Sequence, residues 1–382
     1  MGKMQKYVVV SGFTFSDNNR GTSALSYGAI SFLRQHGILE ENQIVLNVGF
    51  GYPFRLLWSP LVLTEKVQID SKVWVHKKII LSFVEQQIIK HIPFLIPVTR
   101  IARIIKNAGV IAAINGGDGF SDIYGARTFD SRLPESIVAV KLKMPLIFLP
   151  QTLGPFKSSK ELVRGINILK HAQYVYLRDE KFVEVLKENG INYYLAKDLS
   201  FYMRPEPIDI NIPLKSIGLN VSGLCYNNNY GPLAGRFSNY AELIDKIISR
   251  FQELGCHVFL IPHSFNYKCP ENNNDDLQAS KDVYSKLDSK TNVTLINGDL
   301  TPPQLKYIIS KMSFFIGTRM HSNFAAIFTN TPLYGLSYSY KFEGAFKSNN
   351  IPLTNLSNVL DLQESEIKKT VDSILSAYYR LN

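Results

Sequence analysis

Short apolar runs that each end in a polar, often glycine-containing loop are the feature that most constrains how this chain folds. In the first half, residues 6–12, 44–48, 110–114 and 145–149 have the character of buried strands, and a helical pattern covers 22–36. A strand, a loop, a helix and a second strand in this order begin a parallel α/β sheet. Ligands bind at the C-terminal edge of such sheets, so the loops after the strands are expected to carry the function.

A second series of the same kind follows the proline-rich stretch 205–213. Its apolar runs predict strands at 216–221, 257–261, 293–296 and 314–317, and its helical patterns cover 240–254, 276–287, 302–311 and 322–328. A chain of 382 residues exceeds what one core usually supports. The predicted fold class is α/β, with two Rossmann-like domains that face each other across a cleft, in a glycosyltransferase-B-like arrangement. We predict an N-terminal domain at 1–205, a C-terminal domain at 214–360, and a helix within 361–382 that packs back on the N-terminal domain.

The composition indicates what kind of molecule the protein binds and in which compartment it works. The formal net charge is +10 and the isoelectric point is near 9.2, which favours an anionic partner. Cys225, Cys256 and Cys269 are odd in number and lack metal-type spacing, so neither a disulfide framework nor a zinc site is expected. No apolar run is long enough for a membrane span or a signal sequence. These features favour a reducing, cytoplasmic location, to which a peripheral position at the inner face of the membrane is added as a hypothesis.

The segment 55–106 concentrates the positive charge. It holds nine Lys or Arg residues against three acids, a net +6 in 52 residues, and Trp58 and Trp74 lie among them. Helices are predicted at 79–91 and 94–106, separated by Pro93. Two interpretations stay open. The segment is either an interfacial patch for anionic lipid head groups, or an insertion whose helices pack on the sheet and keep their lysines in water.

The stretch 317–323 is the most chemically suggestive loop. It joins the apolar run 314–316 to a helical pattern, so it predicts a strand that leads into a helix N-terminus. Backbone N–H groups there are unpaired and the helix dipole is positive, which suits an anion. Arg319 and His321 add two different donors at the same place, with Ser322 beside them.

The motifs in their order resemble the polysaccharide pyruvyl transferase family, and the resemblance runs through most of the chain. The segments that carry it are Asn19-Arg20-Gly21, Gly116-Gly117-Asp118-Gly119, Gln151-Thr152-Leu153-Gly154-Pro155-Phe156, Arg178-Asp179, Lys197-Asp198-Leu199-Ser200-Phe201, Gly317-Thr318-Arg319-Met320-His321, and a closing stretch that runs from Pro332 through Ser339-Tyr340-Lys341. The resemblance implies a glycosyltransferase-B-like fold. It also implies transfer of the carboxyvinyl group of phosphoenolpyruvate to two sugar hydroxyls, which leaves a pyruvate ketal and releases phosphate. The expected partners are phosphoenolpyruvate and a glycan acceptor, lipid-linked or polymeric; no cofactor, metal or nucleic acid is expected.

The resemblance also places individual residues. Arg319 and His321 match an Arg-x-His pair at the donor, Lys341 matches a later lysine, and Arg178 matches the arginine of an Arg-Asp motif. Two positions depart from the family pattern. Asp118 stands where a third successive glycine is common, and Lys197-Asp198-Leu199 follows Ala196 where Ala-Asp-Pro is usual. The first change suggests a different acceptor, and the second a structural difference.

The chemistry of this reaction agrees with those residue types. Phosphoenolpyruvate carries a carboxylate and a phosphate, and guanidinium groups suit bidentate contact with both, so Arg178 and Arg319 are predicted to clamp it. His321 has a reference pKa near neutrality and is the candidate proton shuttle. Asp118 is the candidate base for the sugar hydroxyl. The predicted site thus has His321, Arg319 and Asp118 as catalytic residues, with a binding set of Arg178, Lys341, Gly116, Gly117 and Ser322.

Each of these residues also has a purely structural interpretation. His321 can bond its own backbone at a helix start, Arg178 and Asp179 can form an ion pair, and Asp118 can cap the following helix. Lys341 can be a solvated lysine. His263, in the loop after 257–261, is expected to make a structural bond.

Two other functions fit parts of the sequence. A glycosyltransferase that uses a nucleotide-activated sugar has the same architecture; it usually needs an acid near the ribose, for which only the Glu343 region offers a candidate. A polyanion-binding protein without catalytic activity fits the charge. The bases, however, gather in one apolar insertion rather than in a stripe with stacking aromatics.

Overall fold

The first apolar run forms β1 (Tyr7–Ser11) in the computed structural model, which describes residues 7–381 apart from Asn42, Ser71 and Tyr340. Lys6, predicted to begin this strand, and Tyr340, quoted in the closing motif, lie outside the described residues. The chain divides into two units. The first comprises the residues up to Phe15 together with Leu25–Met203, and the second comprises Ser16–Ala24 together with the residues from Arg204 onward. The sequence predicted that all of 1–205 belongs to the N-terminal domain. The structure differs in one segment, because Ser16–Ala24 belongs to the second unit.

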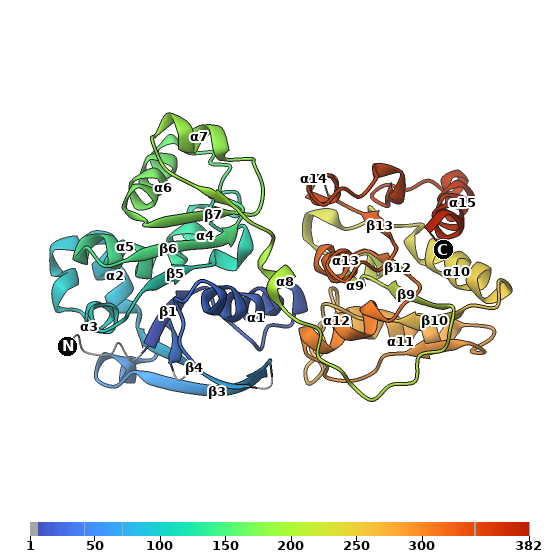
Figure 1. Cartoon of the computed structure of the whole chain (residues 1–382), viewed down its shortest axis with the longest axis horizontal. Helices are drawn as coiled ribbons and strands as arrows, with labels where there is room; N and C mark the ends of the chain where they lie inside the picture. Colours follow the sequence, from blue (N-terminus) through green and yellow to red (C-terminus); the bar gives the residue numbers. More distant parts are fainter. Residues whose placement is uncertain (1–6, 42, 71, 340, 382) are drawn as a thin grey trace. The chain divides into compact units, whose positions relative to one another are not determined.

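The first unit is built on an eight-stranded sheet in the order β3-β4-β2-β1-β5-β6-β7-β8. All neighbouring strands are parallel except β3 and β4 (Figure 1). The other strands are β2 (Ile44–Gly51), β3 (Leu61–Ile69), β4 (Lys72–Ser82), β5 (Ile111–Ala113), β6 (Leu146–Gln151), β7 (Tyr174–Leu177) and β8 (Tyr194–Leu195). The α-helices are α1 (Arg20–Gln35), which belongs to this unit from Leu25 onward, α2 (Phe83–His91), α3 (Arg100–Lys106), α4 (Ala126–Ser131), α5 (Pro134–Leu142), α6 (Ser159–His171), α7 (Val183–Glu188) and α8 (Leu199–Tyr202). The short 3₁₀ turns include η1 (Phe54–Leu57), η2 (Pro93–Val98) and η3 (Asn115–Gly117).

A continuous apolar core covers one face of this sheet. Val9, Ile111 and Phe148 point from the strands into it, and Ile101 of α3 and Val138 of α5 pack on them with full burial. Strands covered by helices on both faces read as uninterrupted apolar runs, which is why they were found from the sequence. The core fixes where the strands end, and therefore where their polar loops emerge.

The segment 55–106 differs from its predicted structure. β3 and β4 form an antiparallel hairpin whose register runs from Leu61 opposite Ile80 to Ile69 opposite Lys72. The helix predicted at 79–91 is wrong in its first turn, because residues 79–82 continue β4, and the Ser82 side chain accepts a hydrogen bond from Val84 N at the start of α2. β-propensity depends on partners, and the partner that holds β4 in the sheet is β2, far away in sequence.

The helix predicted at 94–106 is in fact two pieces. Pro97 lies inside η2, and the helical conformation is interrupted at Thr99, which has an extended backbone, before α3 begins. The Thr99 side chain accepts a hydrogen bond from Ala102 N at 3.2 Å, as an N-cap does. Both pieces pack on the sheet through Ile96, Ile101 and other buried side chains. The insertion is therefore an integral part of the first unit.

The second unit is built on a six-stranded, entirely parallel sheet in the order β11-β10-β9-β12-β13-β14. Its strands are β9 (Ser216–Asn220), β10 (His257–Leu260), β11 (Val293–Leu295), β12 (Phe314–Gly317), β13 (Leu333–Ser337) and β14 (Leu356–Asn358). Its α-helices are α9 (Gly223–Asn227), α10 (Tyr240–Glu253), α11 (Asp276–Lys286), α12 (Pro302–Ser310), α13 (Met320–Ile327), α14 (Lys341–Ser348) and α15 (Glu364–Leu381).

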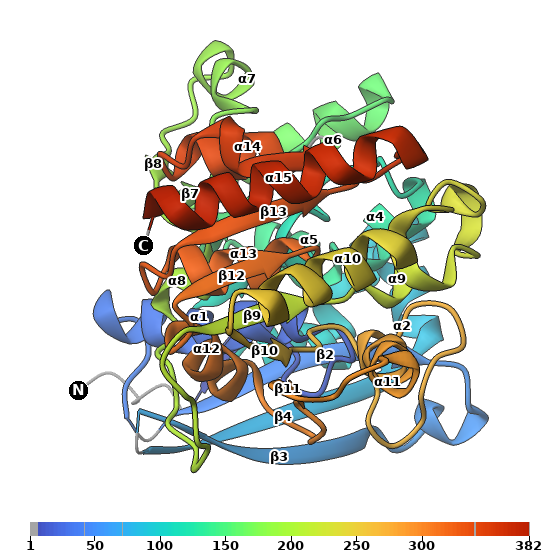
Figure 2. The same cartoon turned by 90° about the vertical axis from the view of Figure 1, so that its right-hand side faces the viewer.

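Helices cover both faces of this second sheet. Alternate residues of one strand serve the two cores: Phe314 and Ile316 face α10 and α15, whereas Phe315 faces α12 and α13. Figure 2 shows α10 and α15 in front of the sheet, with α12 and α13 behind it. The parallel strands all end at one edge, where the loops after β9, β10 and β12 meet.

The C-terminal helix α15 packs within the second unit. Its residues Ile367, Val371 and Ile374 are buried in the core formed with β9 and α10. The prediction that this helix packs back on the N-terminal domain is wrong, because its apolar face is already covered by the sheet of its own unit. Its amphipathic pattern showed that one face is buried but did not identify the surface that buries it.

Within the part of the chain that the structure describes, no helix combines the length and apolar character needed to span a membrane.

Candidate functional site

Asp276 organises the C-terminal edge of the second sheet. It lies at the start of α11 and is fully buried. Its carboxylate accepts hydrogen bonds from the backbone N–H groups of Gly223 (2.9 Å), His263 (3.1 Å) and Ser264 (2.9 Å), and from the side chain of Asn220 (3.2 Å). One carboxylate thus joins the loops after β9 and β10 to α11.

Arg319, which follows β12, completes this arrangement. Its Nη2 lies 2.7 Å from Asp276 Oδ1 and its Nε lies 3.1 Å from the same oxygen, while Nη2 also donates to Asn274 Oδ1 at 2.7 Å. The Asn220 side chain accepts from Arg319 N at 2.8 Å. The Nε–Nη2 edge that a bidentate clamp on substrate would use is therefore occupied by a protein carboxylate. Burial opposes the charge on Arg319, but Asp276 and Tyr338 beside it raise the pKa of the guanidinium above its usual value.

His321 lies in the first turn of α13, two residues beyond Arg319. Its imidazole packs on Gly21 so closely that a Cβ at Gly21 would lie 2.3 Å from Nδ1 and 2.5 Å from Cγ. The Phe324 ring lies edge-on to the imidazole, with 5.7 Å between centroids. Only glycine fits against this ring, which gives a physical reason for the third residue of the Asn19-Arg20-Gly21 motif.

The segment around Arg20 is held to the second unit by several bonds. Arg20 Nη2 donates to Asp299 at 2.8 Å, and Arg20 Nε donates to the carbonyl of Leu300 at 3.0 Å. Its guanidinium carbon lies 4.3 Å from the centre of the Phe265 ring, a cation–π contact. Arg20 N donates to the carbonyl of His263 at 3.1 Å. Arg20 therefore anchors the glycine that touches His321.

His263 is a second imidazole in the same cluster. It is buried, and its Nδ1 has no hydrogen-bond partner among the described residues. Burial lowers its pKa well below the usual value, and the neighbouring charges of His321, Arg319 and Arg20 lower it further. The expectation of a structural bond is met by its backbone, whose N–H binds Asp276. The neutral side chain is left among three basic groups.

Ser322 and Lys341, the other predicted residues of this unit, lie in different surroundings. The Ser322 hydroxyl is fully buried and donates to the Arg319 carbonyl at 2.7 Å, with Asn220 Oδ1 at 3.2 Å. It therefore supports the turn that carries Arg319. Lys341 is half-buried and begins α14.

The first unit brings Arg178 and the glycine loop together. A Cβ at Gly117 would lie 3.1 Å from Arg178 Nη1, and Gly116 and Gly117 both have positive φ angles. Arg178 Nη1 donates to Asp198 at 2.7 Å, and its Nε donates to the Thr152 hydroxyl at 2.9 Å. The ion pair is thus made with Asp198 of the Lys197-Asp198 motif. Although burial disfavours its charge, the nearby carboxylates, led by Asp198, raise the pKa of Arg178.

Asp118 lies at the exit of the same loop. Its Oδ2 accepts a hydrogen bond from the Tyr124 hydroxyl at 2.8 Å. It does not cap the next α-helix, because the N-cap residue of α4 is Gly125. Its carboxylate is also among the charges that act on Arg178. Asp118, Arg178 and the two glycines therefore form one polar group in the first unit.

Arg132 is a cation that the sequence analysis missed. Its buried Nη1 has no hydrogen-bond partner among the described residues, and a Cβ at Gly119 would lie only 1.6 Å from it. Its guanidinium carbon lies 5.6 Å from the centre of the Tyr124 ring. Gly119, the last glycine of the Gly116–Gly119 motif, thus leaves room for the Arg132 guanidinium. The local sequence around either residue does not predict this contact.

Asp276, Arg20 and Asn220 were also missed as site residues. Asp276 was seen only as the beginning of a predicted helix, since local sequence gives no sign that three other segments converge on it. The predicted clamp by Arg178 and Arg319 joins residues of different units, and it stays a prediction. In the described parts of the chain, no group of three or more His, Cys, Asp or Glu side chains is arranged to hold a metal ion.

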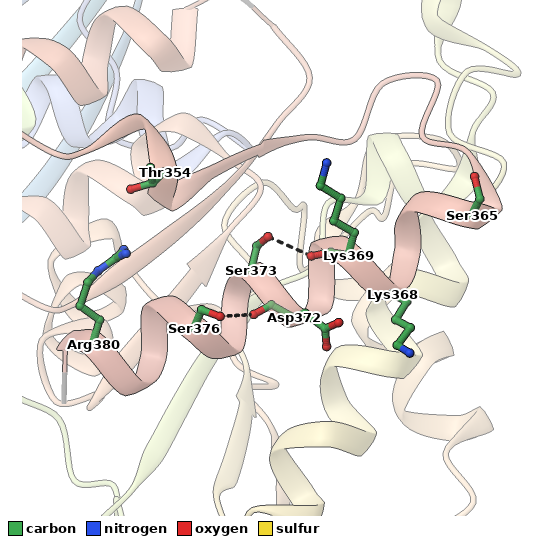
Figure 3. A pocket seen from close by; sticks show the side chains of 8 residues that line it. All are labelled: Thr354, Ser365, Lys368, Lys369, Asp372, Ser373, Ser376 and Arg380. Atoms are coloured by element: carbon green, nitrogen blue, oxygen red, sulfur yellow. Dashed lines mark hydrogen bonds between the residues drawn. The ribbon is translucent and has the colours of Figure 1, made fainter.

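An open hollow of about 520 Å³ lies elsewhere in the second unit, over α15. Figure 3 shows its lining side chains, which are Thr354, Ser365, Lys368, Lys369, Asp372, Ser373, Ser376 and Arg380. It shares no residue with the Asp276–Arg319 cluster. We therefore define the candidate site by the loops at the sheet edge and not by this hollow.

Comparisons with solved structures identify the fold. The UDP-GlcNAc 2-epimerase from Methanocaldococcus jannaschii is similar with a TM-score of 0.54 and 11% identity, over 98% of this chain and 92% of that one. A protein described as a UDP-N-acetylglucosamine 2-epimerase from Listeria monocytogenes gives a TM-score of 0.55 and 10% identity, over 99% and 91% of the two chains. At this identity the likeness concerns the fold alone. It confirms two Rossmann-like units of the glycosyltransferase-B-like kind.

Comparisons with known sequences identify the family. The chain is 22% identical over 278 residues to the amylovoran biosynthesis protein AmsJ of Erwinia amylovora, a match that spans 69% of this chain and 65% of that protein. The model of the polysaccharide pyruvyl transferase family matches residues 19–340, from the segment that packs on His321 to the closing motif. The resemblance drawn from the ordered motifs is therefore confirmed, and this chain belongs to the polysaccharide pyruvyl transferase family.

Proposed function

We propose that this chain transfers the carboxyvinyl group of phosphoenolpyruvate to two hydroxyls of a sugar, in a surface polysaccharide or its lipid-linked precursor, and releases phosphate. Membership of the family supports this proposal, as does a relative named for amylovoran biosynthesis. The observation that carries it is the cluster of Arg319, His321, His263 and Arg20 at the C-terminal edge of a parallel sheet, where α/β proteins bind ligands.

The proposed reaction balances without an outside reagent. One sugar hydroxyl adds to C2 of phosphoenolpyruvate, and the methylene carbon gains a proton in place of the one that this hydroxyl loses. The bond between C2 and the phosphate oxygen then breaks. A second hydroxyl adds to C2 and gives up its proton, which leaves with phosphate. No step requires a metal ion or cofactor, since the donor is itself a substrate.

His321 is the proposed proton carrier for these steps. It is the imidazole at the N-terminal turn of α13, where the helix dipole favours an anion such as phosphate. His263 stays neutral because burial and three basic neighbours lower its pKa. A neutral imidazole thus lies beside the proposed proton carrier.

Arg319 is proposed to supply positive charge to the donor from a fixed position. Asp276 holds its Nε–Nη2 edge, so the contact with substrate is assigned to Nη1. A guanidinium held in this way is preorganised and loses little side-chain entropy on binding. Asp276 is thus proposed as a positioning residue.

The first unit is proposed to bind the acceptor. Asp118 is the candidate base for a sugar hydroxyl, and Gly116 and Gly117 let the acceptor approach the backbone. Arg178 and Lys341 are retained as proposed substrate-binding residues, whereas Ser322 is assigned to support Arg319 because its hydroxyl is buried. Nucleic acid is not a proposed partner.

An acceptor screen tests this proposal. The full chain is incubated with phosphoenolpyruvate and a panel of galactosides and other glycosides, and phosphate release is followed. Mass and NMR analysis then examine the product for a ketal. The expected result is phosphate release that needs both substrates. Turnover of a sugar nucleotide without phosphoenolpyruvate would overturn the proposal in favour of a glycosyltransferase.

A further inference from the structure

Five apolar side chains at one end of the first sheet are strongly exposed to solvent. They are Tyr52 (81% exposed), Phe54 (73%), Trp58 (67%), Val84 (39%) and Val98 (77%), and we call them the aromatic patch. In Figure 2 the chain between β2 and β3, in blue at lower right, leaves the sheet at this end. Exposed apolar groups that gather in this way mark interaction sites more often than scattered ones do.

Several contacts hold the backbone beneath the patch in place. Arg100 Nη1 donates to the Leu56 carbonyl at 3.0 Å, and Arg100 Nη2 donates to the Leu57 carbonyl, which ties η1 to the start of α3. Glu85 of α2 accepts from Arg100 N at 2.9 Å and from Ile101 N at 3.1 Å. η1, η2, α2 and α3 therefore meet at one junction.

The exposed rings belong to this junction. Tyr52 stacks on Phe83 with 5.0 Å between ring centroids, and Phe54 lies edge-on to Trp58 at 4.8 Å. Leu56, between them in sequence, is buried and fixes η1 to the sheet. The rings are thus displayed outward from a fixed support and do not fold back into the core.

The segment 55–106, which carries most of the patch, has a positive and mostly uncompensated charge. Six of the nine bases in 55–106 form no ion pair with any described residue: Arg55, Lys66, Lys77, Lys78, Arg103 and Lys106. The three acids of the segment are each engaged inside the unit: Glu65 with His76, Asp70 with Arg34, and Glu85 with Arg100. The insertion therefore presents bases and apolar side chains together, without competing acids of its own.

We propose that the aromatic patch and its surrounding bases dock on an anionic phospholipid bilayer. Trp and Tyr favour the head-group level of a membrane, where an apolar ring and a polar edge are both accommodated. Unpaired Lys and Arg add attraction to anionic lipids, and their aliphatic stems pack on the acyl boundary. The charge of the surface selects this partner, and the inference does not depend on the proposed transferase reaction.

Vesicle co-sedimentation of the full chain tests the proposal at physiological salt. Vesicles of phosphatidylcholine with about one-third phosphatidylglycerol are compared with vesicles of phosphatidylcholine alone. The chain has two tryptophans, and Trp58 is exposed whereas Trp74 is buried, so Trp58 reports contact directly. The expected result is sedimentation with anionic vesicles only, together with a blue shift of the tryptophan emission that Trp58→Phe removes without releasing the protein.

Substitutions separate the two contributions to binding. Phe54→Ser with Trp58→Ser is expected to weaken vesicle binding at least tenfold. Arg55→Gln, in η1 between the exposed rings, and Arg103→Gln, near Glu85, are each expected to weaken it about fivefold. The matched control is Leu214→Ser in the second unit, since Leu214 is 96% exposed and lies outside the patch. Thermal unfolding checks that every variant is folded.

Three results would overturn the proposal. The wild-type chain could stay in the supernatant with anionic vesicles, or Phe54→Ser/Trp58→Ser could bind as well as the Leu214→Ser control. In a third outcome, the Trp58 emission is already blue-shifted without vesicles, and light scattering gives twice the mass of one chain. That result would assign the patch to contact with a second copy of the chain. Phosphate release from a soluble acceptor should be unchanged in the patch variants, so a failure of this proposal is distinguishable from a failure of the transferase proposal.

Discussion

Replacing Gly21 with alanine tests whether the position of His321 matters. The new Cβ would lie 2.3 Å from His321 Nδ1, 2.5 Å from Cγ and 2.7 Å from Cβ. Ordinary van der Waals contact begins at 3.4 Å, so the ring or the helix that carries it must move by about 1 Å. A misplacement of this size at a reacting group costs about 100-fold in rate, which is the loss expected for Gly21→Ala.

The effect on stability is expected to be smaller. Alanine in the first turn of α1 gains up to about 1 kcal/mol of helix propensity over glycine. Overpacking costs about 1–3 kcal/mol, so the free energy of unfolding should fall by about 0–3 kcal/mol. The rate of phosphate release and urea unfolding are measured on the same preparations. A large loss of rate with a small loss of stability is the expected signature.

Gly344→Ala is the matched control. Gly344 lies inside α14 with no atom within 4 Å of the position of a new Cβ, so only the propensity gain applies and activity should be unchanged. In a Gly21→Ala/His321→Ala double variant the ring contacts at 2.3 and 2.5 Å are absent and only the contact with Cβ at 2.7 Å remains, so part of the stability lost in Gly21→Ala should return. If Gly21→Ala is as active and as stable as Gly344→Ala, the reasoning about His321 is wrong.

Three further predictions concern single side chains. Asp276→Asn leaves Arg319 buried without a counter-charge and should lower the free energy of unfolding in urea by about 3–5 kcal/mol. Asp361→Asn, which breaks an exposed pair with Arg236, is the control and should have a much smaller effect; equal losses would contradict the role of Asp276. Burial raises the pKa of Glu135 from 4.5 to about 7, so the folded state keeps a proton that the unfolded state releases, and stability should fall by about 3 kcal/mol as the pH rises from 4.5 through 7. Glu135→Gln should therefore be more stable than the wild type at pH 8 and flatten this dependence, which urea unfolding at pH 5 and pH 8 would measure. His321→Ala should abolish phosphate release with little change in the thermal midpoint, and full activity would refute its proposed role as proton carrier.

The amino-acid sequence by itself determined the α/β class and most of the second sheet. β9, β10, β11 and β12 were found because strands buried on both faces are continuous apolar runs, a signal that needs no partner to be read. The order of motifs also identified the family, and the anion-suited turn at Arg319 and His321 was visible from a strand that leads into a helix. Each strand and each motif is a local property of a few adjacent residues, and the order of the motifs is read directly along the chain.

Only the tertiary structure decided what those residues contact. Arg319 was predicted to face a substrate, yet Asp276, 43 positions earlier, holds its guanidinium. Gly21 touches His321 across 300 positions, and α15 packs on its own unit. The end of β4 was misread as a helix because its strand conformation is set by pairing with β3 and, at residues 81–82, with β2 alone. Side-chain partners and sheet neighbours depend on how distant segments pack together in the fold. The pattern of apolar and polar residues in one segment shows which face is buried, but it does not identify the distant segment that covers that face.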